Sequence, residues 1–288
     1  MPASSVYPWA GQVKPTRVAG SKSVERCERV GRFHEEEIPD ARIRKTRSDP
    51  VAAAWLRWRR PGSRMSKQEP YLAALRFRWL TPFYDRVVGV LLREEPLKRS
   101  LLRQARIEDG HRVLDVGCGT GTLTLMAQRE YKGALVFGVD GDLETLALAR
   151  RKALATDTPL YACAALAQDL PFPDATFDRV VSSLFFHHLT RPGKKAVLRA
   201  IGAVLSPEGE LHILDWGKAQ DLLMRILFVL VQLLDGFETT ADSVRGRLVG
   251  LLRDAGFTQV EETHRERSIL GTLSLYRAAA AGDAGKPV

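Results

Sequence analysis

The chain has 288 residues, 45% of them hydrophobic, which is enough to bury a sizeable core. Its formal net charge of +9 is uneven, because residues 1–64 hold 14 Lys and Arg against 7 Asp and Glu, hence +7, and residues 65–288 hold the remaining +2. The near-neutral body argues against nucleic-acid binding, and three cysteines without a CxxC pair argue against a disulfide framework or a metal site.

Membrane and export signals are also missing from the sequence. The longest apolar run, 222–234, is broken by Arg225 and Gln232, whereas a membrane span needs roughly 20 apolar residues. The first 30 residues lack the continuous apolar core of a signal peptide. We therefore expect a cytoplasmic protein without a transmembrane segment.

Residues 1–64 mix Pro, Gly, Ser and Arg with acidic clusters and show no periodicity, which favours a disordered basic extension. Three interpretations remain open: a tail that binds acidic surfaces, a targeting segment, or a solvated extension without function. We favour the last, with Met65 as the true start, because an orderly helical pattern follows it. We expect the folded domain to span 65–277 and the tail 278–288 to be disordered.

Two helices are expected near the start of this domain, packing over one end of it. Apolar residues recur at helical spacing, with Thr81-Pro82 between the two groups. The first group is Leu72, Leu75 and Trp79, and the second is Val87, Val90 and Leu91.

Short apolar strands then alternate with helices, which is typical of parallel βαβ units. The expected strands are 112–116, 135–139, 160–164, 177–182 and 211–214, and the expected helices are 121–131, 143–155 with Asp142 as N-cap, and 194–205. Helices at 221–234 and 243–255, the latter capped by Gly256, and strands near 259–263 and 272–276 complete the pattern. The fold class is α/β.

A glycine turn joins the first strand to the helix that follows it, with the sequence Gly117-Cys118-Gly119-Thr120-Gly121. Glycine lets the backbone approach a ligand that a Cβ would exclude. The spacing is GxGxG, whereas the dinucleotide fingerprint GxGxxG would need its third glycine at Thr122. Pyrophosphate binding is therefore disfavoured.

Asp140 ends the second strand, 21 residues after Gly119. In a doubly wound sheet this position faces the same crevice as the glycine turn. A carboxylate there can accept hydrogen bonds from both hydroxyls of a ribose. The alternative role, a helix cap, fits Asp142 better.

The glycine turn, Asp140, the stretch 170–178 (LPFPDATFD) and the stretch 205–210 (LSPEGE) together resemble the small-molecule class I S-adenosylmethionine (SAM) methyltransferases. This family includes the ubiquinone/menaquinone C-methyltransferases, and the likeness covers roughly 112–257. It implies a Rossmann-like, doubly wound sheet of seven strands in the order 3-2-1-4-5-7-6, with the last strand antiparallel. It also implies SAM as the cofactor.

The resemblance carries roles onto matching positions. Gly117, Gly119 and Thr120 would lie along the methionine part of SAM, and Asp115 would brace the turn. Asp140 would hold the ribose, Ala167 would offer its backbone N–H to the adenine, and Ser183 would face the sulfonium. Where the family often has Asp or Asn, this chain has Leu166, and Gln168 or Asp169 would take over that adenine contact unless it is made by the backbone alone.

Cys118 lies within the turn without a basic partner in the sequence to activate it, and we expect it only to pack.

His187 and His188 follow the fourth strand, at the mouth of the crevice where acceptors dock in this fold. Either could act as a base that removes the acceptor's proton. The alternative is packing beside the cofactor.

An apolar helical face at 222–237 either packs in the core or covers an apolar acceptor such as a quinone, polyketide or lipid. We therefore expect methyl transfer to a small, apolar acceptor. Two rival functions stay open: SAM binding without methyl transfer, and methylation of a nucleic acid recruited by the basic N-terminus.

Overall fold

The structure is a computed structural model that describes residues 94–282. Its seven strands form one sheet in the expected order, β3-β2-β1-β4-β5-β7-β6. β7 runs antiparallel to both of its neighbours, and the other pairs are parallel. The strands are β1 Arg112–Val116, β2 Leu135–Asp140, β3 Tyr161–Ala164, β4 Phe177–Ser183, β5 Leu205–Trp216, β6 Thr258–Ser268 and β7 Gly271–Ala279. The predicted fold class is confirmed.

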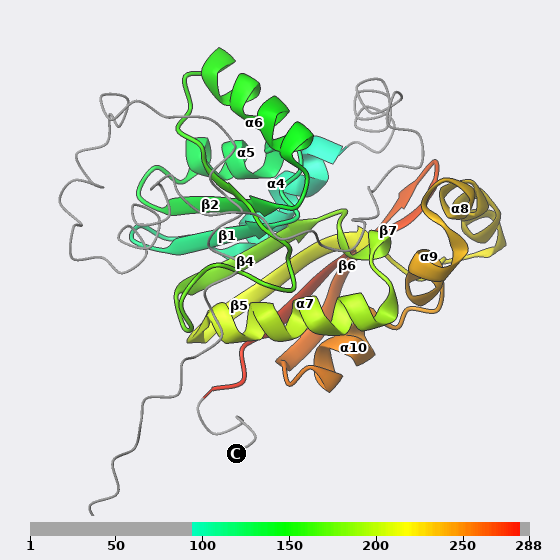
Figure 1. Cartoon of the computed structure of the whole chain (residues 1–288). Helices are drawn as coiled ribbons and strands as arrows, with labels where there is room; N and C mark the ends of the chain where they lie inside the picture. Colours follow the sequence, from blue (N-terminus) through cyan, green and yellow to red (C-terminus); the bar gives the residue numbers. More distant parts are fainter. Residues whose placement is uncertain (1–93, 283–288) are drawn as a thin grey trace, which may run out of the picture.

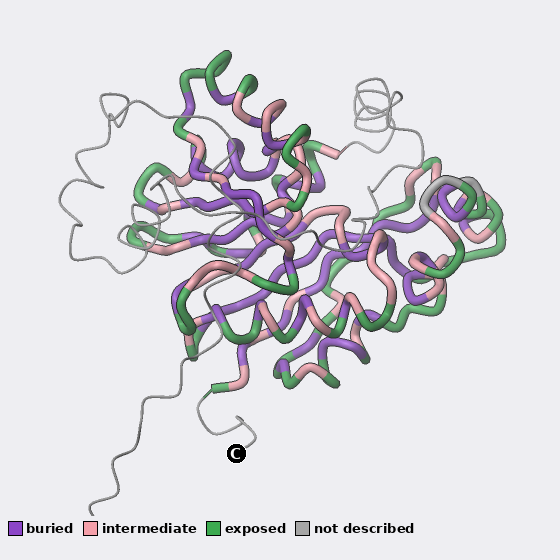
Figure 2. The backbone as a smooth tube through the Cα atoms, viewed as in Figure 1, coloured by how far each residue is buried: buried purple, intermediate pink, exposed green. Residues whose placement is uncertain are grey.

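Helices cover both faces of the sheet (Figure 1): α4, α5 and α6 lie on one side and α7 and α10 on the other, while α8 and α9 lie beyond the end of β5. The strands are mostly buried between these layers (Figure 2). The helices are α4 Glu94–Ala105, α5 Thr122–Glu130, α6 Leu143–Ala155, α7 Arg191–Val204, α8 Leu222–Asp235, α9 Phe237–Val244 and α10 Leu248–Asp254, with a 3₁₀ turn η4 at Phe186–His188.

Several expected elements lie where the sequence pattern puts them. β1 and α6 have the predicted bounds, and the Asp142 carboxylate caps α6 by accepting the backbone N–H of Glu144 at 2.8 Å. The other parallel strands and α5 agree to within a few residues, apart from β5, which is longer than expected. Apolar periodicity and capping chemistry were therefore sufficient signals for this half of the fold.

The helix expected at 243–255 is wrong, because α9 ends at Val244 and α10 begins only at Leu248. Between them Gly246 adopts a left-handed conformation with φ +64°, which the backbone of a helix cannot accommodate. The expected capping glycine is present, since Gly256 has φ +93° directly after α10.

The N-terminal part of the described chain contains a helix that the sequence analysis did not separate. α4 carries Pro96 in its first turn and buries Leu97, Leu101 and Leu102 against the sheet.

The domain extends past its expected end at 277, because Ala278 and Ala279 are paired in β7. The expected extension 1–64, the start at Met65, the two helices at 71–91 and the final residues 283–288 lie outside the described residues. Among residues 94–282, no helix has both the length and the apolar character that crossing a membrane requires.

Candidate SAM and acceptor site

The glycine turn leaves β1 with all three of its glycines at positive φ. At Gly117 an added Cβ would lie 2.3 Å from Cγ of Phe185, so the turn and the segment after β4 are in direct contact. At Gly119 an added Cβ would meet no described atom within 4 Å. The turn is thus closely packed at Gly117 and open at Gly119, where a ligand can approach the backbone.

Asp115 lies beneath this turn and is almost fully buried. Its carboxylate accepts the Thr124 hydroxyl at 2.6 Å, which ties β1 to the first turn of α5. Burial raises the pKa of Asp115 to about 6, although the Thr124 hydrogen bond opposes the shift. This contact is the kind of bracing that the resemblance assigns to Asp115.

The other two residues of the turn, Thr120 and Cys118, make contacts with neighbouring parts of the protein. Thr120 accepts a hydrogen bond from Nζ of Lys152 at 2.6 Å, and Lys152 also reaches Thr122 at 3.0 Å. Cys118 packs against Gly138, where an added Cβ would be 2.9 Å from its Sγ. Burial, with the nearby charges of Asp115 and Asp140, raises the pKa of the Cys118 thiol well above its usual value, so a packing role fits it.

Asp140 at the end of β2 faces the open side of the glycine turn. Its Oδ2 accepts the backbone N–H of Gly119 at 2.8 Å, and its Oδ1 accepts that of Asp142 at 2.8 Å. Burial raises the pKa of Asp140, and these two backbone hydrogen bonds work against the rise. The carboxylate is held in one orientation, and each oxygen keeps accepting capacity for a further donor.

The candidate adenine contacts follow β3. The Ala165 N–H donates to the Asp140 carbonyl at 3.0 Å, so this segment lies beside the end of β2. A turn closed by the hydrogen bond from Asp169 N–H to the Leu166 carbonyl, at 2.9 Å, holds Ala167 buried and Gln168 exposed. The structure therefore brings Ala167 and Gln168 to the same edge of the sheet as Asp140.

Ser183 is the last residue of β4, next to Leu214 of β5. Its Oγ is buried and has no hydrogen-bond partner among the described residues. Buried polar groups without a partner are rare in native proteins, and one in a crevice points to a ligand or to chain that is not described. The role expected of Ser183, facing the sulfonium, stays a prediction.

His187 in η4 is held by a residue that the sequence analysis missed. Its Nδ1 lies 2.8 Å from Oδ1 of Asp215, and its backbone N–H donates to Oδ2 at 3.3 Å. Both side chains are buried. Burial alone would raise the pKa of Asp215, but the His187 charge, the hydrogen bond from His187 and the Trp216 N–H together lower it.

The two histidine rings are in contact, with centroids 3.9 Å apart. The pKa of His188 lies well below its usual value because burial and the His187 charge both disfavour the imidazolium, against a smaller opposing effect of Asp215.

The sequence signal that could have identified Asp215 was its place at the carboxyl end of β5, because the parallel neighbours β4 and β5 end at the same edge of the sheet.

These features fit SAM. An oriented carboxylate at Asp140 suits ribose hydroxyls, and the open side of Gly119 admits a ligand against the backbone. Ser183 offers a hydroxyl that has no partner within residues 94–282. The chain's own geometry thus agrees with the cofactor that the motifs imply.

Comparisons with known proteins give the same answer. Residues 113–209 match the family model described as a methyltransferase domain. An uncharacterized methyltransferase of Synechocystis is 29% identical over 169 residues, which cover 59% of this chain and 77% of that protein. A ubiquinone/menaquinone biosynthesis C-methyltransferase of Cellvibrio japonicus is 30% identical over 187 residues, covering 57% of this chain and 74% of that protein.

Among solved structures, a SAM-dependent methyltransferase from Aquifex aeolicus shares the fold, with a TM-score of 0.52 and 19% identity over 70% of this chain and 97% of that one. Fold, cofactor motifs and relatives therefore agree: the chain belongs to the class I SAM-dependent methyltransferases and resembles the ubiquinone/menaquinone C-methyltransferases.

Proposed function

We propose that this methyltransferase acts on a small, largely apolar acceptor and methylates an oxygen or an activated carbon, with His187 as the base that takes the acceptor's proton. The observation that carries the proposal is the buried His187–Asp215 pair, with 2.8 Å between Nδ1 and Oδ1. It lies at the edge of the sheet where Ser183 and the glycine turn also meet.

The pair specifies one form of the imidazole. An ionised carboxylate can only accept hydrogen bonds, so in the contact between His187 and Asp215 the ring Nδ1 carries the proton. Nε2 of the neutral ring is then the nitrogen with a lone pair. An imidazolium formed by proton uptake at Nε2 would be stabilised by the adjacent carboxylate.

SAM, when bound, supplies an electrophilic methyl group on a sulfonium. The residues that would hold it are Asp140 at the ribose, Gly117, Gly119 and Thr120 along the methionine, Ala167 and Gln168 at the adenine, and Ser183 near the sulfonium. Positioning two reactants in this way can contribute roughly 7–11 kcal/mol to the rate. His187 adds proton removal, which is worth about 10²–10⁴ in turnover.

An apolar acceptor is supported by the surroundings of the pair. His187 packs edge-on against Trp216, with centroids 6.3 Å apart, and Trp216 packs against Phe228 of α8 at 5.2 Å. Phe185 and Phe186, which directly precede His187 in sequence, pack edge-on against each other with centroids 5.7 Å apart. Aromatic and aliphatic linings with few polar groups are typical of sites for apolar small molecules.

The experiment that tests the proposal is incubation of the full chain with methyl-labelled SAM and a metabolite extract, followed by identification of the labelled product. The proposal is supported if the label appears in an apolar product and if the His187→Ala variant no longer forms that product. Label only in nucleic acid would favour recruitment by the basic N-terminus, and binding of SAM without any labelled product would favour a protein that binds the cofactor without transferring methyl.

A further inference from the structure

Helix α8 is apolar on both of its sides. Phe228 and Val231 point inward and are buried against the sheet, and Met224 is also buried. The opposite side, which we call the outer face of α8, consists of exposed large residues: Leu222, Leu223, Ile226, Val229 and Leu233. Figure 2 shows α8 at the edge of the domain with much of its surface exposed. A helix that is apolar all round is normally buried, so the outer face is expected to have a cover.

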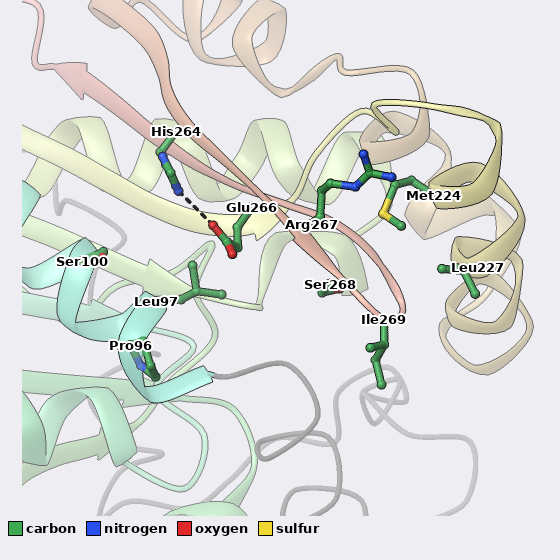
Figure 3. A pocket seen from close by; sticks show the side chains of 10 residues that line it. All are labelled: Pro96, Leu97, Ser100, Met224, Leu227, His264, Glu266, Arg267, Ser268 and Ile269. Atoms are coloured by element: carbon green, nitrogen blue, oxygen red, sulfur yellow. Dashed lines mark hydrogen bonds and ion pairs between the residues drawn. The ribbon is translucent and has the colours of Figure 1, made fainter.

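A groove of about 610 Å³ lies beside this helix. Its apolar lining comes from three elements: Pro96 and Leu97 of α4, Met224 and Leu227 of α8, and Ile269 at the turn between β6 and β7 (Figure 3). Ile269 is itself half exposed. The groove therefore joins the first turn of α4 to the helix with the uncovered face.

The first turn of α4 is also where the described chain begins. The residues directly before it carry large apolar side chains at helical spacing, in two groups. Residues 71–92 contain Leu72, Leu75 and Trp79, then Val87, Val90 and Leu91. At about 1.5 Å per residue this length is sufficient, even if helical, to pass along a helix of 14 residues such as α8.

We propose that residues 71–92 dock into this groove and along the outer face of α8, as an intramolecular cover. A covalently attached segment that starts at the edge of the groove has a high effective concentration there, which favours it over a second copy of the chain. A lipid surface is disfavoured because helices that lie on membranes carry many Lys and Arg, whereas the only one in α8, Arg225, is bonded to Gln232 at 2.8 Å.

The test is the reactivity of an introduced cysteine in the full chain, with Cys27 replaced by Ser and the buried Cys118 and Cys163 retained. Leu222→Cys places a thiol on the outer face, and Leu154→Cys on α6 is the matched control, because these leucines are 74% and 73% exposed in the described structure. We expect a maleimide to label the Leu222→Cys protein at least tenfold more slowly than the Leu154→Cys protein, at every protein concentration and without lipid.

A second step identifies the cover. Adding Leu75→Ser and Trp79→Ser to the Leu222→Cys protein should bring its labelling rate to within about twofold of the control, while circular dichroism verifies that the fold is kept. Equal rates before this change would overturn the proposal. Three other results would also overturn it. Slower labelling of Leu222→Cys at higher protein concentration would mean that a second copy covers the face, and slow labelling only with phosphatidylglycerol vesicles would mean a lipid surface. Slow labelling that persists after the two serine substitutions would mean that residues 71–92 are not the cover.

Discussion

The carboxylate of Asp215 holds His187 at two points, through the ring Nδ1 at 2.8 Å and through the backbone N–H at 3.3 Å. The first contact fixes which ring nitrogen carries the proton, and the second ties the backbone of η4 to the end of β5. Two residues that are 28 positions apart in sequence, one in η4 and one in β5, therefore contribute one chemical unit.

Removing either partner of this unit should impair turnover and leave the cofactor site intact. We expect His187→Ala and Asp215→Asn each to lower turnover by about 10² or more, and the double variant to lose little beyond the single ones, because residues that act as a unit are not additive. Steady-state rates and calorimetry of SAM binding measure the two effects separately. Asp254→Asn on the surface is the control. Loss of SAM affinity in parallel with the rate would make His187 a packing residue, and a defect in His188→Ala alone would transfer the role of base to His188.

Asp140→Ala should weaken SAM binding by about 1.5–3 kcal/mol, the scale of hydrogen bonds to a charged group. The matched control is Asp142→Ala, which removes the cap of α6 at a cost of about 1 kcal/mol in stability but leaves the crevice unchanged. Calorimetry and thermal unfolding of both variants distinguish affinity from stability. Wild-type affinity in the Asp140 variant would show that this carboxylate only orders the glycine turn.

Gly117→Ala should be more harmful than Gly110→Ala, although both glycines have positive φ, +72° and +89°. At Gly110 an added Cβ meets no described atom within 4 Å, so only backbone strain of about 1–2 kcal/mol is expected. At Gly117 the overlap with Phe185 adds a packing cost, about 1–3 kcal/mol for overfilled cores. Chemical denaturation measures the loss of stability in each variant. Equal losses in the two variants would mean that the Phe185 ring can move away from the added methyl group.

The buried Asp115 should make stability depend on pH. Its pKa is raised from 3.8 to about 6, so the folded state binds the proton more tightly than the unfolded state. Stability is therefore lost as pH rises from about 4 to about 6 and is constant with respect to this group above that range. We expect the free energy of unfolding of Asp115→Asn to rise relative to that of the wild type across this window, by up to about 3 kcal/mol. Denaturation at several pH values measures this difference. Thr124→Ser, which keeps the hydroxyl, should follow the wild-type profile, and a variant difference that does not change with pH would contradict this assignment.

Truncation should separate the basic extension from the domain. A chain that starts at Met65 should unfold at the same temperature as the full chain and bind SAM equally well, because residues 1–64 show no core pattern. Thermal unfolding and calorimetry check this. A lower unfolding temperature would mean that the extension packs on the domain, and lost activity with intact folding would revive its role in recruitment.

The sequence was sufficient where one local signal decides the structure. The glycine turn and the Asp142 cap were located because each depends on residues within a few positions of one another. Gly246 was missed because the apolar pattern continues through it, and only its positive φ in the structure separates α9 from α10. Asp215 was missed for a different reason: nothing near it in sequence distinguishes it from other strand-terminal acids, and its role arises from the pairing of β4 with β5.

The contact between Gly117 and Phe185 has a consequence for the alignment of the base. The cofactor turn and the turn that carries the histidines touch without a gap, since an added Cβ would be 2.3 Å from the Phe185 ring. If the glycine turn shifted towards Phe185, it would push on this ring, which lies two residues before His187. We therefore expect the alignment of the His187 imidazole to depend on the conformation of the glycine turn, so that occupancy of the cofactor site also influences how the base is presented to the acceptor.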